Sequence, residues 1–361
     1  MALYLITQQA SILPSNQSPL GALPARFRRE RVLIVGYGDV GQRVAKRLPH
    51  SLKLLALSRN PDRVTQLREQ GVMPLWGDLD DLSSLRRLAG IATRVLHLAP
   101  PPALTAADEG WWLDARTTAL MQALRLRSLP RSLVYASTSG VYGDCKGEWV
   151  SESRPVAPTT ARAQRRVNAE RAVRFAGHSG LRASILRIPG IYAPNREGGT
   201  PRARLLRGTA VLQAADDVYT NHIHADDLAR ASLRALWRGQ PQRIYNVCDD
   251  TQLKMGDYFD LAADLFGLTK PPRISRELAQ AELPASLMSF MSESRRLSNQ
   301  RLKQELKLKL RYPTVTEGLQ SYAVQSAQSL KIGATQTRAA SKRRRHRGGG
   351  VKRLKGNQGM G

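Results

Sequence analysis

Short apolar runs alternate with amphipathic stretches along most of the chain, starting at residue 32. Each apolar run is bounded by turn residues, as buried strands are, and each amphipathic stretch has the spacing of a helix that packs on one face. The predicted strands are residues 32–36, 52–57, 72–75, 94–98, 132–136 and 182–187, and the predicted helices are 42–48, 63–70, 82–88, 111–126 and 163–176. This alternation predicts an α/β fold, a doubly wound parallel (Rossmann) sheet with helices on both faces.

The pattern becomes irregular after Pro189. Short predicted strands (218–223 and 243–247) mix there with predicted helices (226–237, 256–266 and 315–328). We therefore expect four parts: a disordered extension (1–30), a Rossmann domain (31–190), a smaller mixed α/β substrate lobe interleaved with it (191–330), and a basic disordered tail (331–361).

The first predicted strand ends in a glycine-rich turn, GYGDVG at residues 36–41, and a helical stretch follows. In such a turn Gly36 permits the tight bend, Gly38 lets a ligand approach the backbone, and Gly41 lets the helix pack closely on the strand. The amides that open the helix then hold a diphosphate. The turn predicts dinucleotide binding, the alternative being a turn kept only for packing. The candidate contacts are Gly36, Gly38, Asp39, Val40 and Gly41.

The ends of the second and third strands bear on which dinucleotide is bound. An acid closing the second strand would bind the ribose 2′-hydroxyl of NAD and repel a 2′-phosphate. This strand ends instead in Ser58 and Arg59, and a guanidinium can pair with a 2′-phosphate. We therefore expect NADP to be favoured over NAD, unless Arg59 only extends into solvent. After the third strand, Asp78, followed by Leu79, accepts from the adenine amino group or else caps the next helix.

Further motifs resemble the extended short-chain dehydrogenase/reductase superfamily, which contains NAD-dependent epimerases and dehydratases. After the glycine turn, they are Gly77-Asp78-Leu79, His97-Leu98-Ala99, YASTSGVYG at 135–143, LRIPGIY at 186–192, NHIHADDLA at 221–229 and, more weakly, Tyr245-Asn246-Val247. The resemblance runs from about residue 31 to residue 328. It implies a Rossmann fold, a nicotinamide cofactor that Ala99 contacts, and a small polar substrate, such as a sugar- or nucleotide-linked one.

The superfamily's catalytic pattern is incomplete in this chain. The resemblance implies a Tyr as general acid and base, a Lys four residues later that holds the ribose, and a Ser or Thr that orients the substrate oxygen. Thr138 matches the Ser/Thr position, but Arg162 falls at the Tyr position and Arg166 at the Lys position. Arginine stays protonated near neutral pH, so Arg162 cannot transfer a proton, whereas Arg166 can lie over the ribose or phosphates as a fixed cation. The chain thus resembles the divergent, atypical members.

A catalytic protein of this kind needs a proton donor from elsewhere. Tyr142 is the first candidate, because it follows Thr138 at the carboxyl end of a central strand, where open α/β sheets bind ligands. The alternative for Tyr142 is a packing role. Tyr192 is the second candidate, and a structural role is favoured for it.

Two other features have competing interpretations. His222 and His224 alternate on a predicted strand near two aspartates, as in a metal site, but the resemblance favours Asp226 as a helix cap and His224 as a partner of buried backbone. We therefore expect no metal. A long helix that opens at Trp111 carries an apolar stripe of Leu113, Leu120, Met121 and Leu124, and such a stripe in the superfamily often forms a homodimer contact.

Charge and composition bear on the partners and the location of the protein. The chain has 56 Lys and Arg against 29 Asp and Glu, a net charge of +27. Residues 331–361 carry basic residues and no acid, so contact with nucleic acid through this tail is a weak third interpretation. The two cysteines lack a metal-binding spacing, no apolar run is long enough for a membrane span, and residues 1–30 lack a targeting pattern. These features favour a cytoplasmic protein.

The sequence as a whole favours an NAD(P)-binding oxidoreductase or epimerase-like protein that acts on a small polar substrate with a non-standard active site. The alternative from another class is a catalytically silent regulatory protein that senses NADP(H) and acts through a partner. The candidate catalytic residues are Thr138 and Tyr142, and the candidate cofactor contacts outside the glycine turn are Ser58, Arg59, Asp78, Leu79, Ala99 and Arg166.

Overall fold

A seven-stranded parallel sheet forms the centre of the computed structural model, which describes residues 30–103 and 108–320. The sheet consists of β1 (Arg31–Val35), β2 (Lys53–Ser58), β3 (Met73–Trp76), β4 (Arg94–His97), β5 (Ser132–Thr138), β7 (Arg182–Ile188) and β12 (Arg243–Asn246). Their order is β12-β7-β5-β4-β1-β2-β3, and every neighbouring pair is parallel. The predicted α/β doubly wound fold is confirmed.

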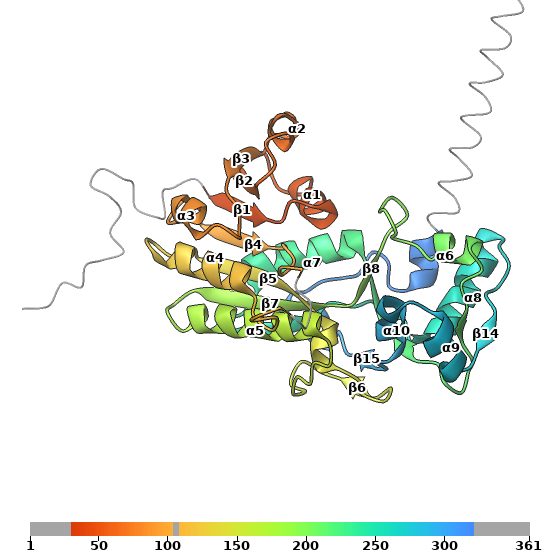
Figure 1. Ribbon diagram of the computed structural model, residues 1–361. Helices are drawn as coiled ribbons and strands as arrows, with labels where there is room; N and C mark the ends of the chain where they lie inside the picture. Colours follow the sequence, from red (N-terminus) through yellow and green to blue (C-terminus); the bar gives the residue numbers. More distant parts are fainter. Residues whose placement is uncertain (1–29, 104–107, 321–361) are drawn as a thin grey trace, which may run out of the picture.

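Helices cover both faces of this sheet (Figure 1). Alternate residues of β1 explain why: Val32 and Ile34 join one hydrophobic cluster, while Leu33 and Val35 join another. The first face is covered by α1 (Asp39–Ala45), α2 (Arg63–Glu69), α7 (Ala225–Arg238) and α11 (Gln300–Glu305). The second face is covered by α3 (Leu82–Leu85), η2 (Arg86–Leu88), α4 (Ala115–Arg125) and α5 (Ala161–Gly177).

The helix predicted to open at Trp111 opens later, as α4 at Ala115. Its N-cap is Asp114, whose carboxylate accepts a hydrogen bond from the Thr117 amide at 2.9 Å. The proposed homodimer stripe is also wrong for three of its four members. Leu120, Met121 and Leu124 are buried against the sheet, so they have no surface to offer a second subunit.

Short elements beyond β7 form a third hydrophobic cluster at one end of the sheet (Figure 1). They are β8 (Gly190–Tyr192), α6 (Arg202–Leu206), β9 (Val211–Leu212), β10 (Tyr219–Thr220), β11 (His222–His224), β13 (Leu253–Lys254), α8 (Met255–Phe266), β14 (Arg273–Ile274), α9 (Arg276–Glu282) and α10 (Ala285–Met291). β6 (Trp149–Val150) pairs with β15 (Arg296–Leu297) nearby. Between these elements the chain returns to the sheet as α7 and β12, so the two parts are interleaved in sequence.

Of the terminal segments predicted to be disordered, residues 1–29 and 331–361 lie outside the described residues, whereas Glu30 is described and pairs with Arg94 at 2.9 Å. The helix predicted at 315–328 is described only as far as residue 320. In the part of the chain that is described, no helix has the length and apolar character needed to cross a membrane.

Candidate functional site

The glycine turn joins β1 to α1 at the carboxyl edge of the sheet. Gly36 has a φ of +96°, and a Cβ there would lie 2.4 Å from the backbone nitrogen of Ala99 at the end of β4. A Cβ on Gly41 would lie 2.9 Å from the carbonyl oxygen of Gly36. By contrast, a Cβ on Gly38, the N-cap of α1, would meet nothing within 4 Å. Two glycines thus permit close packing, and the third leaves an open cradle in which a diphosphate fits.

An acid at the head of α1 complicates this cradle. The Asp39 carboxylate would repel a diphosphate, but two arginines hold it: Arg43 Nε lies 2.9 Å from Oδ1, and Arg196 Nη1 lies 2.8 Å from Oδ2. Arg43 also forms an ion pair with Asp226, in which Nη1 lies 2.7 Å from Oδ1. The two arginines therefore offset the negative charge of Asp39 at the turn. Arg43, four residues after Asp39 on a predicted helix, was recognisable from the sequence, whereas nothing local marks Arg196.

Arg59 directly follows β2, and its side chain is 66% exposed. Its guanidinium lies 3.7 Å from the Asp78 carboxylate and 3.9 Å from that of Asp80, distances at which exposed pairs contribute little. Asp80 is already held by Arg116, with Nε 2.7 Å from Oδ1. Arg59 therefore keeps its donors available. Beside it, the Ser58 hydroxyl lies 3.3 Å from the Asn60 amide, from which it accepts a hydrogen bond.

The proposed capping role of Asp78 is wrong. The N-cap of α3 is Asp81, whose carboxylate accepts from the Ser83 amide at 3.0 Å. Asp78 instead accepts from the Asp80 amide at 3.1 Å, and the adenine-binding role stays a prediction. Leu79 is partly buried and packs its side chain against the cluster on the second face of the sheet, and its role as a cofactor contact stays a prediction.

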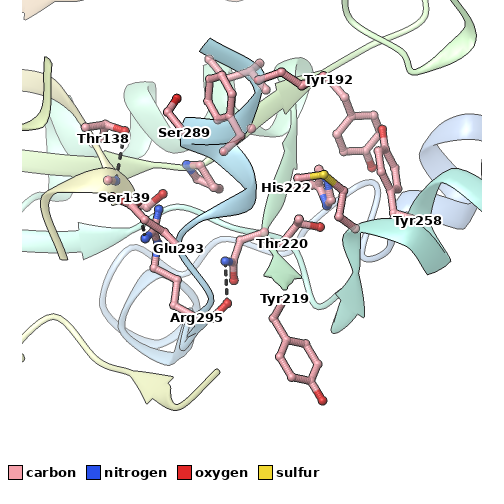
Figure 2. A pocket seen from close by; sticks show the side chains of 18 of the residues that line it. Thr138, Ser139, Tyr192, Tyr219, Thr220, His222, Tyr258, Ser289, Glu293 and Arg295 are labelled. Atoms are coloured by element: carbon pink, nitrogen blue, oxygen red, sulfur yellow. Dashed lines mark hydrogen bonds and ion pairs between the residues drawn. The ribbon is translucent and has the colours of Figure 1, made fainter. Parts of the chain in front are cut away.

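A cavity of about 450 Å³ opens at the carboxyl ends of β5 and β7 (Figure 2). Thr138 ends β5, and its Oγ accepts a hydrogen bond from the Gly140 amide at 3.2 Å. No described residue takes the Thr138 hydroxyl proton, so it can be donated to a ligand. Figure 2 shows Thr138 and Ser139 on one side of the cavity and Tyr192, His222 and Tyr258 on the opposite side.

Two arginines, Arg162 and Arg166, which are predicted to occupy the family's Tyr and Lys positions, line the Thr138 end of this cavity. Arg166 turns toward the sheet, where Nη1 donates to the Ala136 carbonyl at 2.7 Å and to the Tyr135 hydroxyl at 3.1 Å. Arg162 lies over the ring of Phe290, with its Cζ 5.1 Å from the ring centroid. Arg166 is thus fixed at the end of β5, which suits a stationary positive charge beside Thr138.

The structure places Tyr142 away from the cavity. Its side chain is 1% exposed, its hydroxyl donates to Asn246 Oδ1 at 2.7 Å, and burial raises its pKa. The packing alternative is therefore the one that the geometry favours. Tyr192 does line the cavity, but its hydroxyl donates to the Thr314 carbonyl at 3.3 Å and burial raises its pKa as well. Neither tyrosine is poised to exchange a proton near neutral pH.

The two histidines of β11 have different surroundings. His224 is the N-cap of α7, and its Nδ1 accepts from the Asp226 amide at 3.1 Å. The expectation that Asp226 itself caps this helix is wrong. His222 stacks on Tyr258, with the ring centroids 4.2 Å apart, lines the cavity, and has its pKa lowered by burial to about 4. No group of histidine, cysteine or acidic side chains suited to a metal occurs among residues 30–103 and 108–320.

Positive charge dominates the cavity wall. Besides Arg162 and Arg166, Arg204 of α6 and Arg295 line it, and the one acid among the lining residues that the structure describes, Glu293, is paired with Arg295 at 2.7 Å. Arg204 stacks on Phe259 at 4.3 Å, but its buried Nε and Nη2 have no hydrogen-bond partner in the described chain. Burial lowers the pKa of Arg204 to about 10. Because of this unpaired charge, the wall suits an anionic ligand.

The sheet order and the glycine turn define the chain as a Rossmann-type α/β protein. A model of the NAD dependent epimerase/dehydratase family matches residues 32–248, and the chain belongs to that family. The resemblance inferred from the sequence is thereby confirmed. No curated protein matches the sequence.

Solved structures share the fold over most of the chain. A functionally unknown conserved protein from Silicibacter pomeroyi is 30% identical, with a TM-score of 0.68, over 82% of this chain and 99% of that one. MoeE5, in complex with UDP-glucose and NAD, is 22% identical, with a TM-score of 0.65, over 83% and 99%. The UDP-glucuronic acid 4-epimerase from Bacillus cereus, in complex with NAD, is 16% identical, with a TM-score of 0.63, over 82% and 99%. At these identities, the last two show the fold alone.

Proposed function

We propose that the protein is a nicotinamide-dependent oxidoreductase, selective for NADP(H), that acts on a small anionic substrate such as a sugar nucleotide. The observation that carries the proposal is the arginine-rich cavity beside Thr138. Thr138 ends β5, the glycine turn follows β1, and only β4 lies between these strands. Neighbouring strands are about 4.8 Å apart, so the two features lie roughly 10 Å from each other, within the reach of one dinucleotide.

The cofactor, when bound, supplies hydride exchange with a carbon that bears an oxygen. In the reducing direction that carbon gains a hydride and the oxygen gains a proton. Thr138 donates a hydrogen bond from its free hydroxyl to this oxygen, and Arg166 stabilises the negative charge that develops there. Since the hydroxyls of the two candidate donors, Tyr142 and Tyr192, are engaged in hydrogen bonds, we infer that water delivers the proton that this oxygen gains.

The NADP preference is tested at Arg59. We expect the wild type to bind NADPH about tenfold more tightly than NADH, since a guanidinium–phosphate pair contributes roughly 1.5 kcal/mol. Arg59→Ala is expected to equalise the two affinities by weakening NADPH alone, as measured by calorimetric titration. Arg68→Ala, which removes an exposed arginine from α2, is the matched control and leaves the preference unchanged. Equal wild-type affinities would contradict the proposed preference.

The anionic substrate is tested at Arg204. Arg204→Ala is expected to weaken the binding of UDP-glucose, the ligand present in the MoeE5 structure, by ten- to a hundredfold, because the diphosphate of the ligand loses a charge-assisted hydrogen bond from the otherwise unpaired guanidinium. Arg202→Ala alters an exposed residue of the same helix that does not line the cavity, and it leaves binding unchanged. If UDP-glucose and UDP both fail to bind the wild type, the sugar-nucleotide assignment is wrong.

The alternative, a catalytically silent sensor of NADP(H), is favoured by one observation: Arg162 and Arg166 replace the expected proton-transferring pair. Turnover separates the two functions. The oxidoreductase consumes NADPH with a member of a panel of carbonyl compounds and oxidised sugar nucleotides. Tight NADPH binding without consumption, together with a partner protein released by NADP, would instead establish the sensor.

A further inference from the structure

A second cavity, of about 460 Å³, lies apart from the first and shares no lining residue with it. One wall is α5, another is the segment 152–156 that follows β6, and the floor is formed by Arg187 of β7 and Ile244 of β12. We call it the α5 cleft. Its two floor strands, β7 and β12, lie at one end of the sheet, and β5 and β4 separate them from β1 and the glycine turn.

One face of α5 lines this cleft. Val167, Glu170, Arg171 and Arg174 all line it, and their spacing of three, four and seven residues places them on the same side of the helix. Arg171 and Arg174 are exposed, and neither side chain makes an ion pair or hydrogen bond with a described residue. Arg154, on the opposite wall, is held by Glu148, whose Oε2 lies 2.6 Å from Nη1. Two uncommitted guanidinium groups therefore face the cleft.

The floor carries an unpaired donor. Arg187 is 3% exposed, and its Nε and Nη2 donate to the two Glu170 oxygens at 3.1 and 2.8 Å. Its guanidinium lies over the ring of Tyr142, with Cζ 4.6 Å from the ring centroid, and its buried Nη1 has no geometric hydrogen-bond acceptor among the described residues. A buried donor left unpaired destabilises the protein, and an arriving acceptor would recover that lost free energy.

The acids of the cleft are already engaged. Glu170 is held by Arg187 and accepts a hydrogen bond from the Ser137 hydroxyl at 2.6 Å. Glu152 accepts from the Asn246 amide at 3.0 Å. Neither carboxylate is therefore free to neutralise Arg171 and Arg174, and the cleft keeps an excess of positive charge.

We propose that the α5 cleft is a second ligand site, which binds a phosphate group. Arg171 and Arg174 bind the phosphate oxygens from the mouth, and Arg187 supplies the unpaired donor below. Phosphate suits this arrangement because several acceptor oxygens on one compact dianion match guanidinium donors that converge from different elements. The ligand is free inorganic phosphate or a small phosphorylated metabolite.

Calorimetric titration of the full chain tests the site, with inorganic phosphate and glucose 6-phosphate as probes at constant ionic strength set with sodium chloride. We expect binding in the millimolar range, weakened at least tenfold in R171A/R174A and unchanged in R86A/R87A, which removes two exposed arginines from η2. The basic tail is present in every variant, so its contribution cancels. Tighter binding of glucose 6-phosphate than of phosphate supports a metabolite as the ligand, and equal binding supports free phosphate.

Two results would overturn the proposal. Equal phosphate affinity in the wild type and R171A/R174A would show that these arginines bind nothing specific. Loss of phosphate binding in Arg204→Ala, with R171A/R174A unaffected, would locate the anion in the first cavity instead. Because the two cavities share no residue, failure here leaves the proposed oxidoreductase function untouched.

Discussion

Gly38→Ala is expected to weaken NADPH binding about a hundredfold, or roughly 2.7 kcal/mol, while the free energy of unfolding stays close to that of the wild type. A Cβ at this position meets nothing in the protein, and the Gly38 backbone, with φ −86° and ψ −157°, is accessible to alanine. The methyl group would instead fill the space that the diphosphate needs. Calorimetry measures the affinity, and thermal unfolding measures the stability.

Gly36→Ala is the matched control with the opposite expected outcome. Its φ of +96° disfavours alanine, and the added Cβ would lie 2.4 Å from the Ala99 backbone. We expect this variant to lose about 3 kcal/mol of stability or more. If Gly38→Ala binds NADPH as tightly as the wild type does, the diphosphate is held elsewhere, and the proposed role of the turn is wrong.

Thr138→Val is expected to lower kcat by about a hundred- to a thousandfold, with little effect on NADPH binding. Valine keeps the shape of threonine but removes the hydroxyl that the structure leaves free to donate. Loss of one donor to a developing oxyanion has an effect of this size in other enzymes. The measurement is steady-state NADPH consumption, with whichever panel compound the wild type reduces.

Tyr142→Phe is the control for this prediction. The Tyr142 hydroxyl is hydrogen-bonded to Asn246 and does not line the cavity, so we expect kcat to stay within a few fold of the wild type. Loss of this buried hydrogen bond is expected to lower the free energy of unfolding by about 1 kcal/mol. A large loss of kcat in Tyr142→Phe, with full activity in Thr138→Val, would assign the chemistry to the tyrosine and contradict the mechanism.

The fold and the glycine turn were predictable because their signals are local. Val32 to Val35 are apolar in an unbroken run, as a strand covered on both faces requires, and close neighbours of Gly36 and Gly41 leave no room for a side chain at those two positions of the turn. Thr138 was also predictable from a local signal, because it lies at the carboxyl end of a run of strand-forming residues that becomes β5. Arg162 and Arg166 were predicted to be site residues from their positions in the sequence, and both line the cavity.

The rest of the site depends on contacts between distant parts of the chain. Tyr142 follows Thr138 closely in sequence, yet the intervening turn η3 (Ser139–Tyr142) directs it into the core, toward Asn246. Arg196 reaches Asp39 across 157 positions, and no periodicity marks that pairing. Arg204 becomes a cavity residue only because α6 packs against α8. Such placements follow from tertiary packing, which local sequence patterns do not encode.

A crystal structure of the full chain with NADP tests the central claim most directly. The account predicts that the diphosphate lies against the backbone amides that follow Gly38, with the Asp39 carboxylate still held by Arg43 and Arg196 and the nicotinamide end of the cofactor beside Thr138. Density for the dinucleotide at any other place, or a turn closed by the Asp39 side chain with no dinucleotide bound, would contradict it.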